Sequence, residues 1–158
     1  MFQAKLAVFP GQPLAPRREP IDRTMHGLQV TGLLDDLRSG GPHTLIAPIN
    51  RAYDALPWAF EELLFNASLT EPRFDLFEYL VLRGDWPAAG PGGERQTVEG
   101  TPLRIARGFV IGRHGTAMIL RSFVRDNLRV HVVDACVFPA NPQIYVDVRE
   151  ELCEERLC

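Results

Sequence analysis

Residues 41–57 read GPHTLIAPINRAYDALP, and this stretch carries the strongest fold signal in the chain. Its β-branched and aliphatic residues at 44–46 are typical of a buried strand. Pro48 has no N–H to donate to a sheet, so the strand is expected to stop there. Asn50 can cap a helix, and apolar residues follow it at helical spacing. The stretch therefore predicts a strand, a corner and a helix.

Two further helices are predicted in the first half of the chain. An imperfect apolar stripe over residues 22–38 predicts a helix that Ser-Gly-Gly at 39–41 stops. A second helix is predicted from Thr70, which can cap it, to a stop at Gly84. The run from 86 to 96 is rich in glycine and proline and reads as a loop without packing residues.

Beyond this loop the apolar runs shorten and alternate with glycine-containing turns. Four of these runs read as strands: 103–105, 109–111, 118–120 and 128–138. A helical half followed by short strands with hairpin-type turns predicts an α+β fold, with compact β-sheets and helices packed around them.

Three segments differ in composition. Residues 1–22 contain four prolines and few long apolar side chains, which predicts an extended N-terminal arm. Residues 23–140 form the compact domain, and residues 141–158 form an acidic tail. The tail can pair with the seven arginines between positions 95 and 129 or with a partner subunit, although ordinary solvated charge is the simpler interpretation.

Composition narrows the class of protein. The chain has 158 residues, 46% of them apolar, which suffices for one domain with a core. A formal net charge of −3 argues against a nucleic-acid binder. We find no signal-peptide core and no apolar run of the ~20 residues that a membrane span requires. Together with an odd number of cysteines, three, this predicts a cytoplasmic protein, either free or peripheral on the cytoplasmic face of a membrane complex.

Two blocks of the sequence resemble the signatures of the fasciclin domain family. GPHTLIAPINRAYDALP at 41–57 is similar to the first block, and NLRVHVVDACVFP at 127–139 is similar to the second. Between them, LFEYLVLRG at 76–84 stands where the family has its Tyr-His motif, with Leu80 in place of the histidine. The resemblance covers residues 23–140. It implies β-sheets with helices packed around one side, used for adhesion or assembly and not for catalysis.

Signals for chemistry are weak. The four histidines form no pair at metal-ligand spacing, and His131 reads as a structural residue in a strand. Cys153 and Cys158 are poorly spaced to share a metal on a helix, and Cys136 reads as a small buried hydrophobe. Neither a nucleophile elbow nor a phosphate-binding glycine motif is present. We therefore expect no catalytic residue, no metal and no cofactor.

The candidate partner-binding residues lie in two places. Those of the compact domain are Tyr79, Arg83 and Asp85, and those of the tail are Glu150, Glu151, Glu154 and Glu155. Arg83-Gly84-Asp85 spells the integrin-binding tripeptide, which also arises by chance, and its glycine is explained as a helix stop.

The leading hypothesis is a non-catalytic protein–protein interaction module that serves as an accessory subunit of a larger intracellular assembly. The resemblance suggests the fasciclin-like small subunit of the cyanobacterial NDH-1 complex for CO2 uptake, a photosynthetic complex of the thylakoid. The alternative is an exported or surface adhesion protein that binds matrix or polysaccharide around Tyr79, Arg83 and Asp85. A third hypothesis is a metal-assisted, hydratase-like site at His114 or His131. The partner, the interface and any pairing of the tail cysteines stay open.

Overall fold

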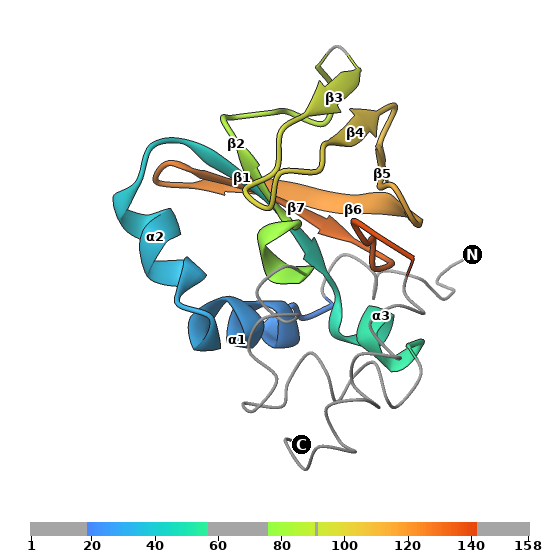
Figure 1. Cartoon of the computed structure of the whole chain (residues 1–158), viewed down its shortest axis with the longest axis horizontal. Helices are drawn as coiled ribbons and strands as arrows, with labels where there is room; N and C mark the ends of the chain where they lie inside the picture. The colour runs from blue at the N-terminus through green and yellow to red at the C-terminus, as the bar shows by residue number, and fades with distance from the viewer. Residues whose placement is uncertain (1–18, 57–75, 91, 142–158) are drawn as a thin grey trace, which may run out of the picture.

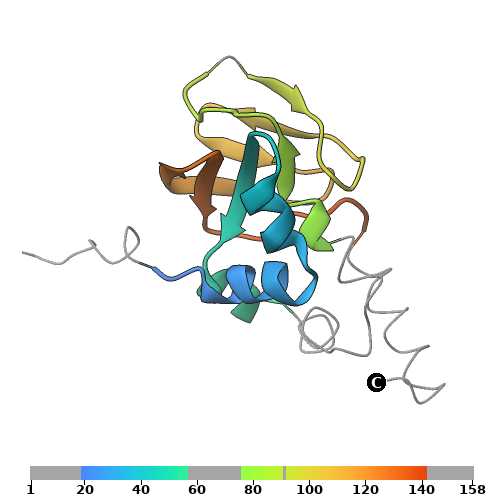
Figure 2. The ribbon, with the colours of Figure 1, turned by 90° about the vertical axis from the view of Figure 1, so that its left-hand side faces the viewer.

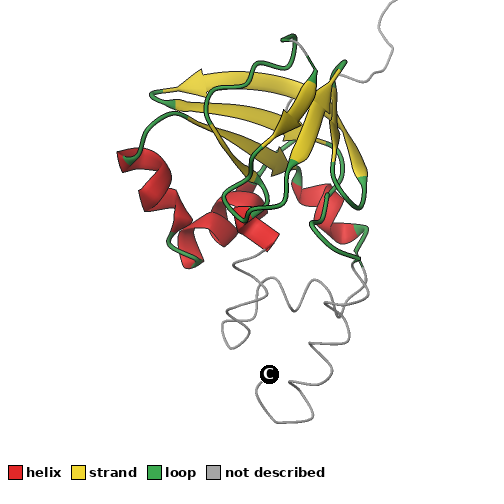
Figure 3. Ribbon diagram, turned by 45° about the horizontal axis from the view of Figure 1, so that its top comes forward, coloured by secondary structure: helices red, strands yellow, loops and turns green. Residues whose placement is uncertain are grey.

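The computed structural model describes residues 19–56, 76–90 and 92–141, in which short helices lie on one side of a curved sheet (Figures 1 and 3). The helices are α1 (Asp22–Val30), α2 (Leu33–Ser39) and α3 (Asn50–Asp54). The strands are β1 (His43–Pro48), β2 (Val81–Arg83), β3 (Gly93–Arg95), β4 (Leu103–Ala106), β5 (Phe109–Ile111), β6 (Thr116–Arg125) and β7 (Leu128–Val133). The predicted α+β class is confirmed.

The strands form one sheet in the order β2-β1-β7-β6-β5-β4-β3. β1 and β7 run parallel, and all other neighbours run antiparallel. Ile46 lies beside His131 and Ala47 beside Val132, so the two signature blocks meet at the centre of the sheet. Leu82 in β2 also bridges to Thr97 after β3, which brings the two edges together and nearly closes the sheet. Figure 2 shows the strands curling above the helices.

The strands differ in how many of their faces are buried. In β1 every residue from Thr44 to Pro48 is buried, and α1 and α3 both contact this strand. β4 and β5 instead alternate, with Leu103, Ile105 and Val110 buried and their neighbours more exposed. A continuous apolar run therefore marks a strand covered on both faces, whereas alternation marks strands that keep one face in solvent.

The corner after β1 forms as predicted, but Asn50 has a different role. β1 ends at Pro48 and α3 begins at Asn50, yet no side chain caps α3. The Oδ1 of Asn50 instead accepts the backbone N–H of Arg23 at 2.9 Å. Asn50 therefore satisfies one of the first-turn amides of α1, a helix far away in sequence, and the prediction that it caps its own helix was wrong.

The stripe over residues 22–38 is divided between two helices. α1 ends at Val30, and α2 starts after Gly32, whose φ of 82° is a left-handed conformation that favours glycine. The hydroxyl of Thr31 donates to the carbonyl of Gly27 at 2.8 Å and supports the end of α1. The predicted stop is confirmed, because α2 ends at Ser39.

The second predicted helix is largely replaced. Its first residues, 70–75, lie outside the described ranges, and only 76–78 are helical. Residues 81–83 form β2, because Val81 and Leu82 pair with β1 and are buried there. Pairing with a distant strand thus overrides the local helical spacing. Gly84 still ends the element, with φ at 95°.

Residues 86–96 are more structured than predicted. They contain β3, and the guanidinium of Arg95 lies 4.0 Å from the ring centroid of Trp86. The prediction of a loop without packing residues was therefore wrong. The reason is again tertiary, because β3 forms by pairing with β4.

The later strands differ from prediction at their ends. β6 spans 116–125 where only 118–120 was predicted, because it pairs with both β5 and β7. β7 ends at Val133, and Phe138 joins the sheet only through a bridge to His114.

The boundary with the predicted arm is partly visible. Residues 19–22 are described, and α1 begins at Asp22. Glu19 forms an ion pair with Arg51 of α3 at 2.7 Å. Residues 1–18 and 142–158 lie outside the described ranges, so the arm and the acidic tail stay predictions. No helix of the described residues has the length and apolar character needed to cross a membrane.

Candidate functional site

The candidate site is the turn at residues 83–86, which follows β2 and contains the Arg-Gly-Asp tripeptide. Arg83 and Asp85 are exposed. Gly84 bends the chain in a left-handed conformation, and its N–H donates to the carbonyl of Pro42 at 3.0 Å. The indole N–H of Trp86 donates back to the carbonyl of Arg83. The turn is therefore closed on itself while its two charged side chains face solvent.

Thr44 of β1 anchors this turn from below. Its side chain is fully buried, and its hydroxyl donates to the carbonyl of Gly84 at 2.8 Å. The same oxygen accepts the N–H of Trp86 at 2.9 Å. One buried hydroxyl thus satisfies two backbone groups of the turn, which would otherwise lack partners in a low-dielectric interior.

His131 of β7 provides a second anchor. Its Nε2 lies 2.8 Å from the carbonyl oxygen of Trp86, which can only accept, so Nε2 carries the proton. Its Nδ1 then accepts the hydroxyl proton of Ser122 at 2.6 Å. Burial lowers the pKa of His131 below its usual 6.5, which keeps the ring neutral at pH 7. His131 is thus a structural residue, and both of its ring nitrogens are hydrogen-bonded.

Asp85 at the tip of the turn is already paired. Its carboxylate forms an ion pair with the guanidinium of Arg129 in β7. The hydrogen bond from Arg129 holds the pKa of Asp85 below its usual range. A partner that pairs with Asp85 therefore has to displace Arg129 or bind both charges together.

Tyr79, the third predicted binding residue of this region, lies in the core. None of its surface is exposed, and its hydroxyl accepts the backbone N–H of Arg113 at 2.9 Å. Burial raises the pKa of Tyr79, so the hydroxyl stays neutral. Its ring is thus not presented to a partner, and it supports the β5–β6 connection instead. The predicted tail residues, Glu150, Glu151, Glu154 and Glu155, lie outside the described ranges.

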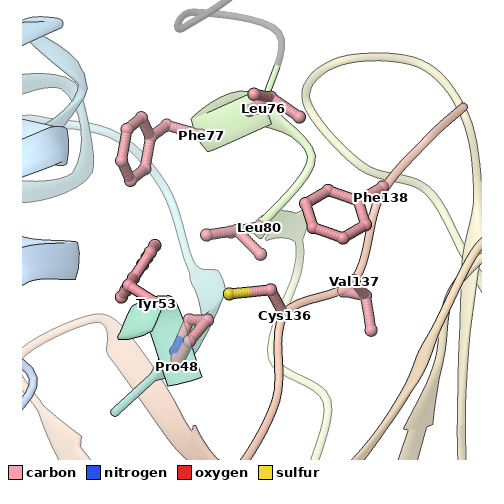
Figure 4. A pocket seen from close by; sticks show the side chains of 8 residues that line it. All are labelled: Pro48, Tyr53, Leu76, Phe77, Leu80, Cys136, Val137 and Phe138. Atoms are coloured by element: carbon pink, nitrogen blue, oxygen red, sulfur yellow. The ribbon is translucent and has the colours of Figure 1, made fainter. Parts of the chain in front are cut away.

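A small apolar pocket lies between α3 and the segment after β7 (Figure 4). Its volume is about 20 Å³, room for about one water molecule. It is lined by Pro48, Tyr53, Leu76, Phe77, Leu80, Cys136, Val137 and Phe138. Burial raises the pKa of Cys136 to about 12, so its thiol is protonated at neutral pH and is a poor nucleophile.

The hydroxyl of Tyr53, which lines this pocket, is hydrogen-bonded within the protein. The hydroxyl of Thr24 donates to the carbonyl of Pro48 at 2.9 Å, so the hydroxyl of Tyr53 is the donor to Thr24, at 2.7 Å. Burial raises the pKa of Tyr53. The pocket therefore resembles packing space between elements more than a reaction site.

The third hypothesis, a metal-assisted site at His114 or His131, finds little support in the geometry. Within the described ranges, no three His, Cys, Asp or Glu side chains gather where they would hold a metal ion. Both ring nitrogens of His131 are hydrogen-bonded to other residues. Cys153 and Cys158 lie outside the described ranges.

The anchors of the turn were missed from the sequence. Thr44, Trp86, Ser122 and Arg129 come from four segments that only the sheet topology brings together. The one local signal is a hydroxyl side chain at the start of an otherwise apolar strand, at Thr44. A polar residue there is expected to have a partner, but the sequence does not say which.

Comparisons with known proteins agree with this architecture. The sequence pattern of the fasciclin domain matches residues 21–139. No curated protein sequence matched the chain. Among solved structures, it is similar to a FAS1 domain pair from the insect cell adhesion molecule Fasciclin I, with a TM-score of 0.56 and 14% identity.

The extent of these matches decides what they establish. The structural match covers 76% of this chain and 45% of the domain pair, so the chain spans less than half of that structure. At such low identity this likeness concerns the fold alone. The match to the family pattern extends over most of the sequence. The chain therefore belongs to the fasciclin domain family, whose members are in general adhesion and interaction modules.

Proposed function

We propose that this chain is a non-catalytic interaction module that serves as an accessory subunit of a larger assembly, peripheral on the cytoplasmic face of a membrane. The observation that carries the proposal is the anchored turn at residues 83–86. Thr44, His131 and Arg129 hold it from two strands while Arg83 and Asp85 face solvent. A loop that is ordered before binding loses less conformational entropy when a partner docks.

The ionisable groups of the interior also favour binding over catalysis. Burial is the main cause of the pKa shifts of Tyr53, Tyr79, His131 and Cys136, and each shift favours the neutral form. A catalytic acid, base or nucleophile usually has a pKa tuned towards the working pH, or access to a cleft. Tyr53, Tyr79 and His131 are instead buried and hydrogen-bonded to other residues of the domain, and Cys136 packs against the core.

The assembly that we propose to test first is the cyanobacterial NDH-1 complex for CO2 uptake in the thylakoid membrane. What supports this choice is that the chain, as a fasciclin domain of this size, resembles the fasciclin-like small subunit of that complex.

Affinity purification of the tagged full chain from its native organism, after gentle solubilisation in mild detergent, tests the proposal. We expect stoichiometric recovery of the same membrane-complex subunits in repeated preparations, and recovery of proton-pump subunits would support the NDH-1 assignment. An unrelated cytoplasmic protein with the same tag is the control. Recovery of the chain only as a free monomer would contradict the proposal.

The exported adhesion alternative depends on the same turn. It needs Arg83 and Asp85 to be available to matrix or polysaccharide, and such a ligand, like a protein partner, has to displace Arg129 from Asp85 or bind both charges together. A hydrophobic leader upstream in the genomic reading frame would favour this alternative over an accessory subunit. So would glycan on Asn66, which is the acceptor of the N-glycosylation motif Asn66-Ala67-Ser68.

A further inference from the structure

A second surface, distinct from the turn, lies on the outer face of β4, β5 and β6. Because side chains alternate along a strand, registered neighbours share one face. Arg104 pairs with Ile111 and Ile111 with Thr116, which forms one row. Ala106, Phe109 and Met118 form the next row. We call these six residues the outer face of β4–β6.

Three large apolar side chains stand exposed on this face. Phe109 is 42% exposed, Ile111 37% and Met118 44%. Phe109 and Met118 are direct cross-strand partners, and Ile111 lies two residues along β5. The opposite face of the same strands is filled by buried side chains such as Val110 and Ala117, so these three are not needed for the core. Such clustering of exposed apolar side chains is typical of an interaction surface.

A hollow adjoins this apolar cluster. Its volume is about 310 Å³, and its lining includes Ile111, Arg104 and Arg113. Arg104 and Arg113 are both exposed. Arginine presents a planar fork of N–H donors that matches a carboxylate with two parallel hydrogen bonds. The hollow therefore presents two cationic side chains beside an apolar one.

The charge of this region is opposite to that of the whole protein. Residues 103–125 contain five arginines and no aspartate or glutamate, whereas the chain has a formal net charge of −3. One acid, Glu94 of β3, lines the hollow and pairs in register with Arg104. The excess of arginine is thus local, and among the residues that line the hollow Glu94 is the one carboxylate that competes for it.

We propose that the outer face of β4–β6 binds an acidic segment of a partner protein. Carboxylates of the segment pair with Arg104 and Arg113 at the hollow, and its apolar side chains pack on Phe109, Ile111 and Met118. The inference deepens the proposed function and rests on it, because it gives the interaction module a second surface besides the turn at 83–86, together with a partner chemistry.

Charge favours a protein segment over a membrane or a nucleic acid. Both of those present extended anionic surfaces, which the net charge of −3 repels at long range. A short peptide segment interacts mainly with the arginines next to it and less with the net charge of the whole protein. The exposed apolar cluster also has no counterpart in a phosphate backbone.

The test is fluorescence anisotropy of a short fluorescein-labelled peptide of aspartate and glutamate interspersed with leucine and phenylalanine, titrated with the full chain. We expect saturable binding that weakens with added salt. Two control peptides replace either the apolar residues by serine or the acids by lysine. Both are expected to bind at least about fivefold more weakly, because each lacks one of the two contacts.

Variants that should weaken peptide binding and one that should strengthen it locate the site. R104E/R113E is expected to weaken binding about tenfold, and I111S by about fivefold. E94Q removes the competing carboxylate and is expected to strengthen binding about twofold. The four substituted positions of these three variants are exposed, so the unfolding free energies should match that of the wild type, which chemical denaturation checks.

Several outcomes would overturn the inference. These are absence of peptide binding, equal binding of the lysine peptide, or binding unchanged by R104E/R113E. Binding to vesicles of equal phosphatidylcholine and phosphatidylglycerol, or to duplex DNA, without binding to the peptide would assign the face to another partner class. Failure here counts against this face alone, because the purification experiment above decides the proposed function separately.

Discussion

The covered centre of the sheet and the outer face of β4–β6 use their polar and apolar residues in opposite ways. In the centre, the side chains of Thr44 and His131 are buried, and their hydrogen bonds hold the turn at 83–86. On the outer face, Phe109 and Met118 are exposed and fill no part of the core. The difference indicates that the centre maintains the shape of the domain while the outer face is free for a partner.

The largest expected effect is in the covered region, at the contact between α1 and Phe77. A Cβ added at Gly27 would lie 2.0 Å from the Phe77 ring, which is 1% exposed. G27A should therefore lower the unfolding free energy by about 2–3 kcal/mol, although alanine normally favours a helix. Urea denaturation measures this. G41A is the matched control, because nothing lies within 4 Å of its added Cβ, and equal stability of the two variants would contradict the packing.

The next effect concerns the anchor of the turn. T44V keeps the shape of the side chain but removes the hydroxyl that serves Gly84 and Trp86. We expect a loss of about 2 kcal/mol in unfolding free energy and faster hydrogen exchange at the Trp86 amide. T44S retains the hydroxyl and should lose less. Unchanged exchange in T44V would show that the turn does not depend on this bond.

Much of this contrast follows from local sequence. The continuous apolar run of β1 and the alternation of β4 and β5 each predict how many faces are covered, and the corner at Pro48 needs only the missing N–H of proline. β2 and β3 could not be predicted, because each exists by pairing with a strand distant in the fold. The target of Asn50 depends in the same way on where α1 packs.

The candidate site was predictable only in part. The motif at 83–85 is visible in the sequence, but the burial of Tyr79 and the pairing of Asp85 with Arg129 are not. Both depend on the order of the strands. The exposure of Phe109 and Ile111 could have been suspected from alternation, but the position of Arg104 beside Ile111 required the register of β4 and β5.

The third prediction uses pH to probe the centre of the sheet. Because the pKa of His131 is lower in the folded chain than its usual 6.5, the unfolded chain takes up a proton first as pH falls. This contribution to stability is therefore lost between pH 6.5 and the lower folded pKa, with a slope of at most about 1.4 kcal/mol per pH unit. Denaturant titrations over this range measure it.

Two variants isolate this dependence. H131Q lacks the titrating ring, so the slope of unfolding free energy against pH should lose the contribution of one proton. H114Q is the control, because His114 joins the sheet through its backbone. An unchanged slope in H131Q would assign the proton uptake to another group.

The smallest effect on stability is expected on the outer face. F109S removes a side chain that is 42% exposed, so its unfolding free energy should stay within about 0.5 kcal/mol of the wild type. Thermal or urea denaturation checks this. V110S, its buried neighbour on β5, should lose about 2 kcal/mol or more. Similar losses in both variants would remove the distinction between the two regions.

Hydroxyl-radical footprinting of the full chain, free and within its purified assembly, tests the central claim most directly. Oxidation of Phe109 and Met118 should be clear in the free chain and strongly reduced in the assembly. Buried Tyr53 and Tyr79 should stay unreactive in both states. Equal oxidation of Phe109 and Met118 in the two states would contradict the account, because the outer face of β4–β6 would then remain in solvent when the protein is bound.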